Sequence, residues 1–150
     1  MKYIEDIDLG DEFGPVQIEV KPNDVIDFCK TWIRDEENSK NIFNAAPTRF
    51  TDEEFAKTEG LPGAIVPGIM SMAYLARLLN TAWPDGTITQ LDVVFRQLVL
   101  HNQIINLVGV VTDTVSEDDQ NFIECDVYIE NSEGSRLVGG KARLDIPSKN

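Results

Sequence analysis

Apolar and polar residues follow two different patterns along the 150-residue chain, and the change lies near Pro84. Before this point, alternation over 16–20 predicts a short strand, and helical spacing over 22–34 predicts an amphipathic helix that begins at a proline. The polar segment 35–50 that follows is long for a loop, and ordered loops of this length often contribute to functional sites.

Two further helices are expected before the change of pattern. Thr51, with Glu54 three residues later, has the spacing of a capping box and predicts a short helix that ends at Gly60. The segment 68–83 is the most hydrophobic helix candidate, because apolar residues cover most of its circumference. A helix of this kind needs cover on every side, so we expect it to lie buried at the centre of the fold.

After the turn Pro84-Asp85-Gly86, strict alternation predicts four strands, at 87–95, 103–114, 121–130 and 135–146. The short links 115–120 and 131–134 predict hairpins, and we interpret the four strands as an antiparallel meander with one dry face. The dry face and the apolar helix each need a partner. We therefore expect a single α+β domain over 1–150, in which a curved antiparallel sheet wraps around a long central helix.

Composition excludes several classes of function. Lys and Arg total 13 against 26 Asp and Glu, and a net charge of −13 disfavours nucleic acid and anionic membrane surfaces as partners. The first residues do not resemble an export signal and no apolar run is long enough to span a bilayer, so we expect a cytoplasmic protein. Cys29 and Cys125 are expected to be core residues, and no cluster of metal ligands is apparent.

Two segments resemble the MaoC-like hydratase and dehydratase family. They are Phe50-Thr51-Asp52-Glu53-Glu54-Phe55-Ala56 and Ile65-Val66-Pro67-Gly68-Ile69-Met70, and Phe95-Arg96 extends the similarity. The family pattern is roughly G-D-x-N-P-x-H-x-D-x-x-x-A, followed by I-x-H-G-M. The resemblance implies a hot-dog fold. It also implies that the ligand is an acyl thioester of coenzyme A or of an acyl carrier protein, which the family hydrates or dehydrates without a further cofactor.

The family's site residues transfer only in part. Asp52 and Ala56 match its downstream Asp and Ala, which puts its catalytic Asp at Ala45 and its catalytic His at Phe50. In the second motif the His position is Pro67, whereas the glycine is retained as Gly68. The resemblance therefore implies that the Gly68 backbone N–H polarises a thioester carbonyl, while the usual acid–base pair is absent.

Several residues could have either a substrate-binding or a structural role. The candidates for substrate binding are Arg49, Phe50, Pro67, Gly68, Ile69 and Ser71. Gly68 also suits a tight turn, and Phe50 also suits an apolar wall. Arg49 could meet a ligand anion or pair with Asp52 or Glu53.

Two other residues are candidates for proton transfer. Asp52 is a candidate acid or base, although its place at a helix start also explains it. His101, the only histidine, stands at a predicted turn, where we expect it to be solvent-exposed and idle.

Three functions remain open on the sequence. The first is a thioester-binding subunit that needs an active partner, and the second is a hydratase or dehydratase with unusual acid–base residues. The third, a hot-dog thioesterase, fits the resemblance less well. We expect a homodimer, because exposed strand edges favour pairing, with a heteromer containing a catalytic relative as the alternative.

Overall fold

The computed structural model describes residues 2–31, 47–117 and 120–149. It contains a short 3-10 helix, three α-helices and five strands within these ranges. In chain order these elements are η1 (Ile4–Asp6), β1 (Glu12–Glu19), α1 (Pro22–Lys30), α2 (Glu53–Thr58), α3 (Gly68–Ala82), β2 (Thr87–Phe95), β3 (Ile104–Glu117), β4 (Gln120–Asn131) and β5 (Arg136–Asp145).

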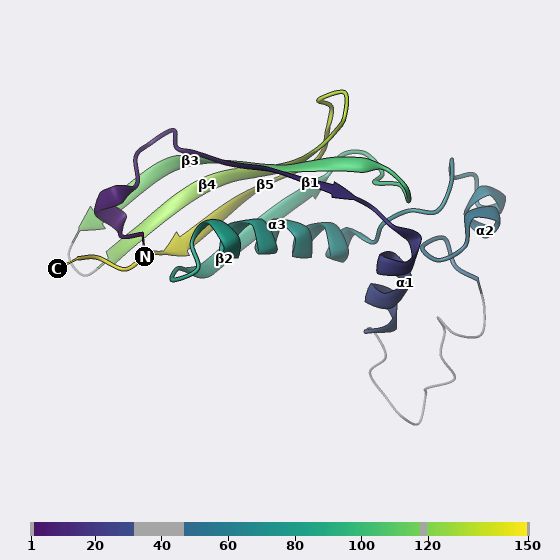
Figure 1. Ribbon diagram of the computed structural model, residues 1–150, viewed down its shortest axis with the longest axis horizontal. Helices are drawn as coiled ribbons and strands as arrows, with labels where there is room; N and C mark the ends of the chain where they lie inside the picture. Colours follow the sequence, from purple (N-terminus) through teal and green to yellow (C-terminus); the bar gives the residue numbers. More distant parts are fainter. Residues whose placement is uncertain (1, 32–46, 118–119, 150) are drawn as a thin grey trace.

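The five strands form one antiparallel sheet in the order β1-β3-β4-β5-β2, and α3 lies along one face of it (Figure 1). The predicted α+β class is confirmed, but the predicted meander is wrong for β2. This strand pairs with β5 at one edge of the sheet, whereas β3 pairs with β1 and β4. Alternation along a strand determines which face it buries. It does not determine which strand lies beside it.

Some strands end later or begin earlier than predicted, because hydrogen-bonded strand pairing continues beyond the residues with alternating apolar side chains. The predicted link 115–120 is mostly strand, because β3 continues to Glu117 and β4 begins at Gln120. The predicted helix 22–34 is confirmed as α1 to Lys30, and positions 32–34 lie outside the described residues. The hairpin at 131–134 is confirmed, with the Asn131 side chain accepting the N–H groups of Glu133 and Ser135.

The core lies between α3 and the sheet. Alternation along the predicted strand 121–130 puts four apolar side chains on one face, and all of them are buried: Ile123, Cys125, Val127 and Ile129. Their partners on α3 include Leu75 and Leu79, which have no exposed surface. Cys29 and Cys125 are free and buried, as expected of core cysteines, and burial raises the pKa of the Cys125 thiol to about 12.

The expectation that α3 is covered on every side is wrong for the single chain. The sheet covers the side that carries Met70, Ser71, Leu75, Leu78 and Leu79. On the other side Ala73 is exposed, and the side chain of Ile69 in the first turn is 58% exposed. A sheet contacts one side of a helix, so the remaining apolar side needs another partner.

None of the helices in the described ranges has the length and apolar character needed to cross a lipid bilayer.

Candidate functional site

The start of α3 presents free backbone N–H groups. Pro67 is the N-cap and its carbonyl oxygen accepts the N–H groups of Met70 and Ser71, at 3.0 and 3.2 Å. Within the described ranges, the N–H groups of Gly68 and Ile69 have no acceptor. Unpaired N–H groups at a helix start carry partial positive charge, so this end of α3 favours a carbonyl oxygen or an anion.

Hydrogen bonds hold the segment before α3 against two other parts of the chain. The Val66 N–H donates to the Val99 carbonyl at 2.8 Å, next to a bridge between Ile65 and Leu100. The Ile65 N–H donates to the Arg49 carbonyl at 3.0 Å, which joins the two motifs found in the sequence. The start of α3 is therefore held in a defined position.

Phe95, at the end of β2, lies against Gly68. A Cβ atom placed on Gly68 would lie 2.9 Å from the Cζ of the Phe95 ring, closer than normal packing allows. Close packing is therefore one reason for a glycine here, in addition to any role of its N–H. Phe95 is 52% exposed and Ile69 is 58% exposed, so apolar surface borders the free N–H groups. The sequence showed Phe95 only as part of the resemblance, because the contact depends on the pairing of β2 with β5.

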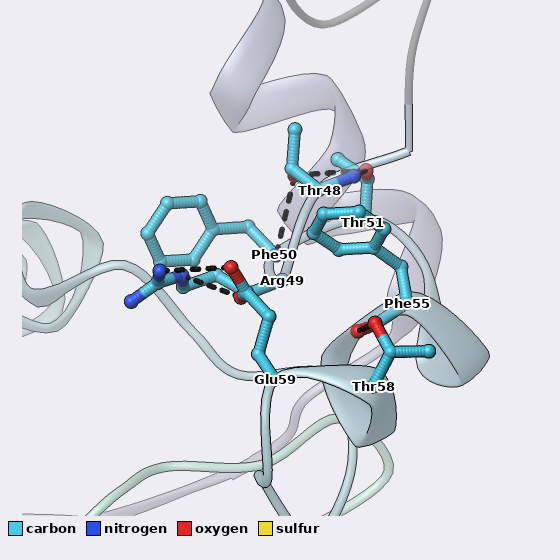
Figure 2. Close-up of polar contacts among 7 residues, drawn as sticks. All are labelled: Thr48, Arg49, Phe50, Thr51, Phe55, Thr58 and Glu59. Atoms are coloured by element: carbon cyan, nitrogen blue, oxygen red, sulfur yellow. Dashed lines mark hydrogen bonds and ion pairs between the residues drawn. The ribbon is translucent and has the colours of Figure 1, made fainter.

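Figure 2 shows how the first motif is arranged before and along α2. Asp52 is the N-cap of α2, and its Oδ1 accepts the Phe55 N–H at 2.7 Å. The predicted capping box at Thr51 is therefore wrong by one position, and the Thr51 hydroxyl hydrogen-bonds to the Thr48 hydroxyl at 3.0 Å (Figure 2). The helix ends at Thr58, two residues before the predicted stop. The Asp52 carboxylate is therefore already hydrogen-bonded to the backbone of α2.

Arg49 forms its ion pair with a residue that the sequence did not indicate. Its Nε lies 2.9 Å from Oε2 of Glu59, and Nη2 lies 3.1 Å from Oε1, a two-point contact (Figure 2). The expected pairing with Asp52 or Glu53 is wrong, because the turn after α2 brings Glu59 back beside Arg49. Both side chains are partly exposed, so this pair adds little stability.

Glu53 and His101 both hydrogen-bond to the backbone of Ala64. Glu53 Oε2 accepts the Ala64 N–H at 2.8 Å, and the His101 N–H donates to the Ala64 carbonyl at 3.0 Å. Nothing in the sequence indicated the Glu53 contact, which spans 11 residues and depends on the fold of the loop.

The expectation that His101 is fully exposed is wrong. It is partly buried, and its Nε2 is buried without a hydrogen-bond partner among the described residues. Burial lowers the pKa of the imidazole, while a hydrogen bond to the Phe50 backbone and the charge of Glu53 act in the opposite direction. The folded chain therefore favours neutral His101.

This burial predicts a pH effect on stability. The folded-state pKa of His101 lies below the unfolded value of 6.5, so the unfolded chain binds more protons. The contribution of His101 is complete above that value and is lost as the pH falls below it. Urea unfolding of wild type and His101→Asn from about pH 7 to pH 5 checks this. The wild type should lose more free energy of unfolding than the variant, which keeps every carboxylate, and equal losses would contradict the prediction.

The remaining candidates occupy different environments. Phe50 is partly buried against the core, and Pro67 is buried. Ser71 is 2% exposed, which leaves little of its surface for a ligand in the single chain. Ala45 lies outside the described residues. In the part of the chain that is described, no three His, Cys, Asp or Glu side chains are grouped in a way that could hold a metal ion.

Two hollows lie on the sheet in the described residues. The larger hollow is lined by residues of β2, β3, β4 and β5, and the smaller one by residues of β4 and β5 such as Phe122 and Arg143. The first turn of α3 borders neither of them.

Comparison with known proteins places the chain among related folds. The family model described as "MaoC like domain" matches residues 50–132. No curated protein sequence matches the chain. Among solved structures, an (R)-hydratase from A. caviae involved in PHA biosynthesis is similar, with a TM-score of 0.75 at 17% identity, over 94% of this chain and 98% of that chain.

Two similar structures are complexes from Mycobacterium tuberculosis. The ChsH1-ChsH2 complex gives a TM-score of 0.71 at 14% identity, over 93% of this chain and 98% of that one. The HadBC complex, described as a 3R-hydroxyacyl-ACP dehydratase, gives 0.70 at 13% identity, over 91% and 95%. At these identities the likeness shows the fold, and it confirms the expected hot-dog arrangement.

Proposed function

This chain belongs to the MaoC-like domain family, and on that premise we propose that it binds an acyl thioester at the start of α3 and needs a partner chain for catalysis. The observation that carries the proposal is the pair of free N–H groups at Gly68 and Ile69. Fixed N–H donors at a helix start suit a thioester carbonyl, whose oxygen gains negative charge when water is added or removed.

The side chains around this site support binding more than catalysis. Phe50 stands where the family has its catalytic His, and a phenyl ring transfers no proton. The nearby carboxylates already have structural partners: Asp52 caps α2, Glu53 holds Ala64, and Glu59 pairs with Arg49. None of these three carboxylates is therefore free to act as the base.

A second chain is the proposed source of the missing groups. Two exposed apolar side chains lie where β2 ends and α3 begins, Phe95 at 52% and Ile69 at 58% exposure. The strand β2 is also at a sheet edge, with an unpaired side that can extend the sheet. We propose that a copy of this chain, or a catalytic relative, covers this surface and completes a crevice at Gly68.

The proposal also covers the thioester carrier, the cofactor requirement, the excluded partners and the location in the cell. The thioester carrier is coenzyme A or an acyl carrier protein, and the reaction needs no metal or other cofactor. The high negative charge argues against nucleic acid and membrane surfaces as partners, and the proposed site of action is the cytoplasm.

Two substitutions at Gly68 test the N–H donor. Gly68→Pro removes the N–H at the first helical position, which tolerates proline, and Gly68→Ala keeps it. Both add a Cβ beside the Phe95 ring, so the alanine variant controls for that contact. We expect calorimetry with a panel of enoyl- and 3-hydroxyacyl-CoA thioesters to show about tenfold weaker binding for the proline variant. The alanine variant should stay within about threefold of wild type.

Equal affinity of the two variants would show that the Gly68 N–H does not bind the thioester. No binding by wild type would reject the proposal as a whole. Turnover assays on the same thioesters separate the other two functions. Hydration by the purified chain alone, lost in Asp52→Asn, would mean an active hydratase. Release of free thiol would mean a thioesterase.

A further inference from the structure

The face of the sheet that points away from α3 contains a hollow of about 470 Å³. It spans β2, β3, β4 and β5, and the polar side chains that line it alternate with the buried residues beneath α3. Figure 1 shows α3 along one face of the sheet, so the sheet separates α3, which begins at Gly68, from the side chains that line this hollow on the other face. The hollow is independent of the proposed thioester site.

Basic side chains gather in this hollow although the chain is strongly acidic. They are Arg96, Arg136, Lys141 and Arg143. Within the described ranges, no carboxylate oxygen lies within 4.0 Å of any of these four groups. These four cations share the hollow with the carboxylates of Asp92, Glu124 and Asp126, so an anion is favoured only at the end that lies away from those carboxylates.

At one end of the hollow the cations have carboxylates as neighbours. Lys141 of β5 lies between Asp92 of β2 and Asp126 of β4 in the strand register. Arg143 lies opposite Glu124 of β4. Opposite charges on adjacent strands attract each other, so this end is close to electrically balanced.

The other end has cations around an uncharged floor. Gly139 lies between Val94 and Tyr128 in the register, and a Cβ placed on it would have only the Nε of Arg96 near it, at 3.9 Å. The guanidinium of Arg136 stacks over the Tyr128 ring, with 4.0 Å from Cζ to the ring centre. Stacking fixes the plane of the guanidinium and leaves the N–H groups at its edge open to an acceptor.

One carboxylate lies near this end without closing it. Glu130 is opposite Arg136 in the register, but it does not line the hollow and none of its oxygens lies within 4.0 Å of the guanidinium. The two arginines beside Gly139 are therefore open to an external anion.

We infer that the Gly139 end of the hollow binds a small organic anion, with one phosphate or carboxylate group held between Arg96 and Arg136. The apolar body of this ligand lies over Gly139, against Val94 and Tyr128. Guanidinium groups bind both kinds of anion through paired N–H donors, and the volume of the hollow suits a small molecule.

Titration of the ¹⁵N-labelled full chain at constant ionic strength tests this site, with phenyl phosphate and benzoate as probes. We expect saturable shifts of the Gly139 amide and of the Arg96 and Arg136 side-chain N–H signals. Arg96→Gln and Arg136→Gln should each weaken binding about tenfold or more, since each removes charged hydrogen bonds. The tighter probe identifies the anionic group.

A third variant blocks the site without changing any charge. Gly139→Val places a side chain on the open floor, at a strand position where valine is well tolerated, and should abolish saturable binding. If the valine variant does not fold, Gly139→Ala gives the same test with a smaller loss.

Arg77→Gln is the matched control, because Arg77 is an exposed cation on α3 with no ion pair in the described part of the chain. Its affinity for both probes should equal that of wild type. Shifts that stay linear with probe concentration, or saturable binding that survives Arg96→Gln and Arg136→Gln, would overturn the inference. So would equal weakening by Arg77→Gln, because it would indicate a general charge effect.

Discussion

The Ile69→Asp variant is expected to be monomeric at concentrations where the wild-type chain forms a dimer. Ile69 is 58% exposed in the first turn of α3, where a carboxylate interacts favourably with the helix dipole. The substitution should therefore leave the monomer folded. In a two-fold dimer through this surface, two unpaired carboxylates would be buried, at a cost of about 3 kcal/mol or more, which is about 100-fold or more in the dissociation constant.

Sedimentation analysis over a dilution series measures this dissociation constant. Leu9→Asp is the matched control, because Leu9 is also an exposed apolar residue, at 69%, but precedes β1 near the N-terminus. It should dimerise like wild type. A dimer that tolerates Ile69→Asp would show that chains pair through a different surface. A wild-type chain that stays monomeric alone, but dimerises with a catalytic relative, would favour the heteromer.

The Leu75→Ala variant is expected to lose about 3 kcal/mol or more of free energy of unfolding. Leu75 lies in the middle of α3 with no exposed surface, within the cluster that joins α3 to the sheet. Alanine removes the buried side chain and leaves a cavity, because a rigid sheet cannot close around it. Urea unfolding followed by circular dichroism, at a fixed protein concentration, measures the loss.

Asn80→Ala is the control for the same helix, since Asn80 is exposed and alanine is a good helix former. It should change the free energy of unfolding by less than about 0.5 kcal/mol. A loss of less than about 1 kcal/mol in Leu75→Ala would contradict the assigned core, because a truncated leucine with no exposed surface costs more.

The dry face of the sheet was predictable from residue types alone. Alternation placed Ile123, Cys125, Val127 and Ile129 on one side of a strand, and all four are buried. The partner of β2 was not predictable, because a strand with one apolar face can lie beside any neighbour that shares that face. The exposed side of α3 has a similar cause. Apolar residues show that a helix needs cover, but they do not show whether that cover comes from the same chain.

Some features of the candidate site were likewise predictable from the sequence, and others were not. The assignment of family positions to Gly68 and Phe50 rests on the resemblance and stays a prediction. The start of a helix at Gly68 follows from the proline before it and the helical spacing after it. The contacts of Arg49 and Glu53 could not be found in this way. They depend on turns after α2 that bring Glu59 and Ala64 back to the first motif.

The sequence by itself determined the α+β class, the buried face of β4, the helix that begins at Gly68, and the family to which the chain is similar. These properties depend on residue type and on the fixed periods of helices and strands, which act over a few residues. Only the tertiary structure decided the order of the strands, the contact of Phe95 with Gly68, and the hollow around Gly139. These features depend on the packing of residues far apart in the chain, and packing follows the shape of the whole core.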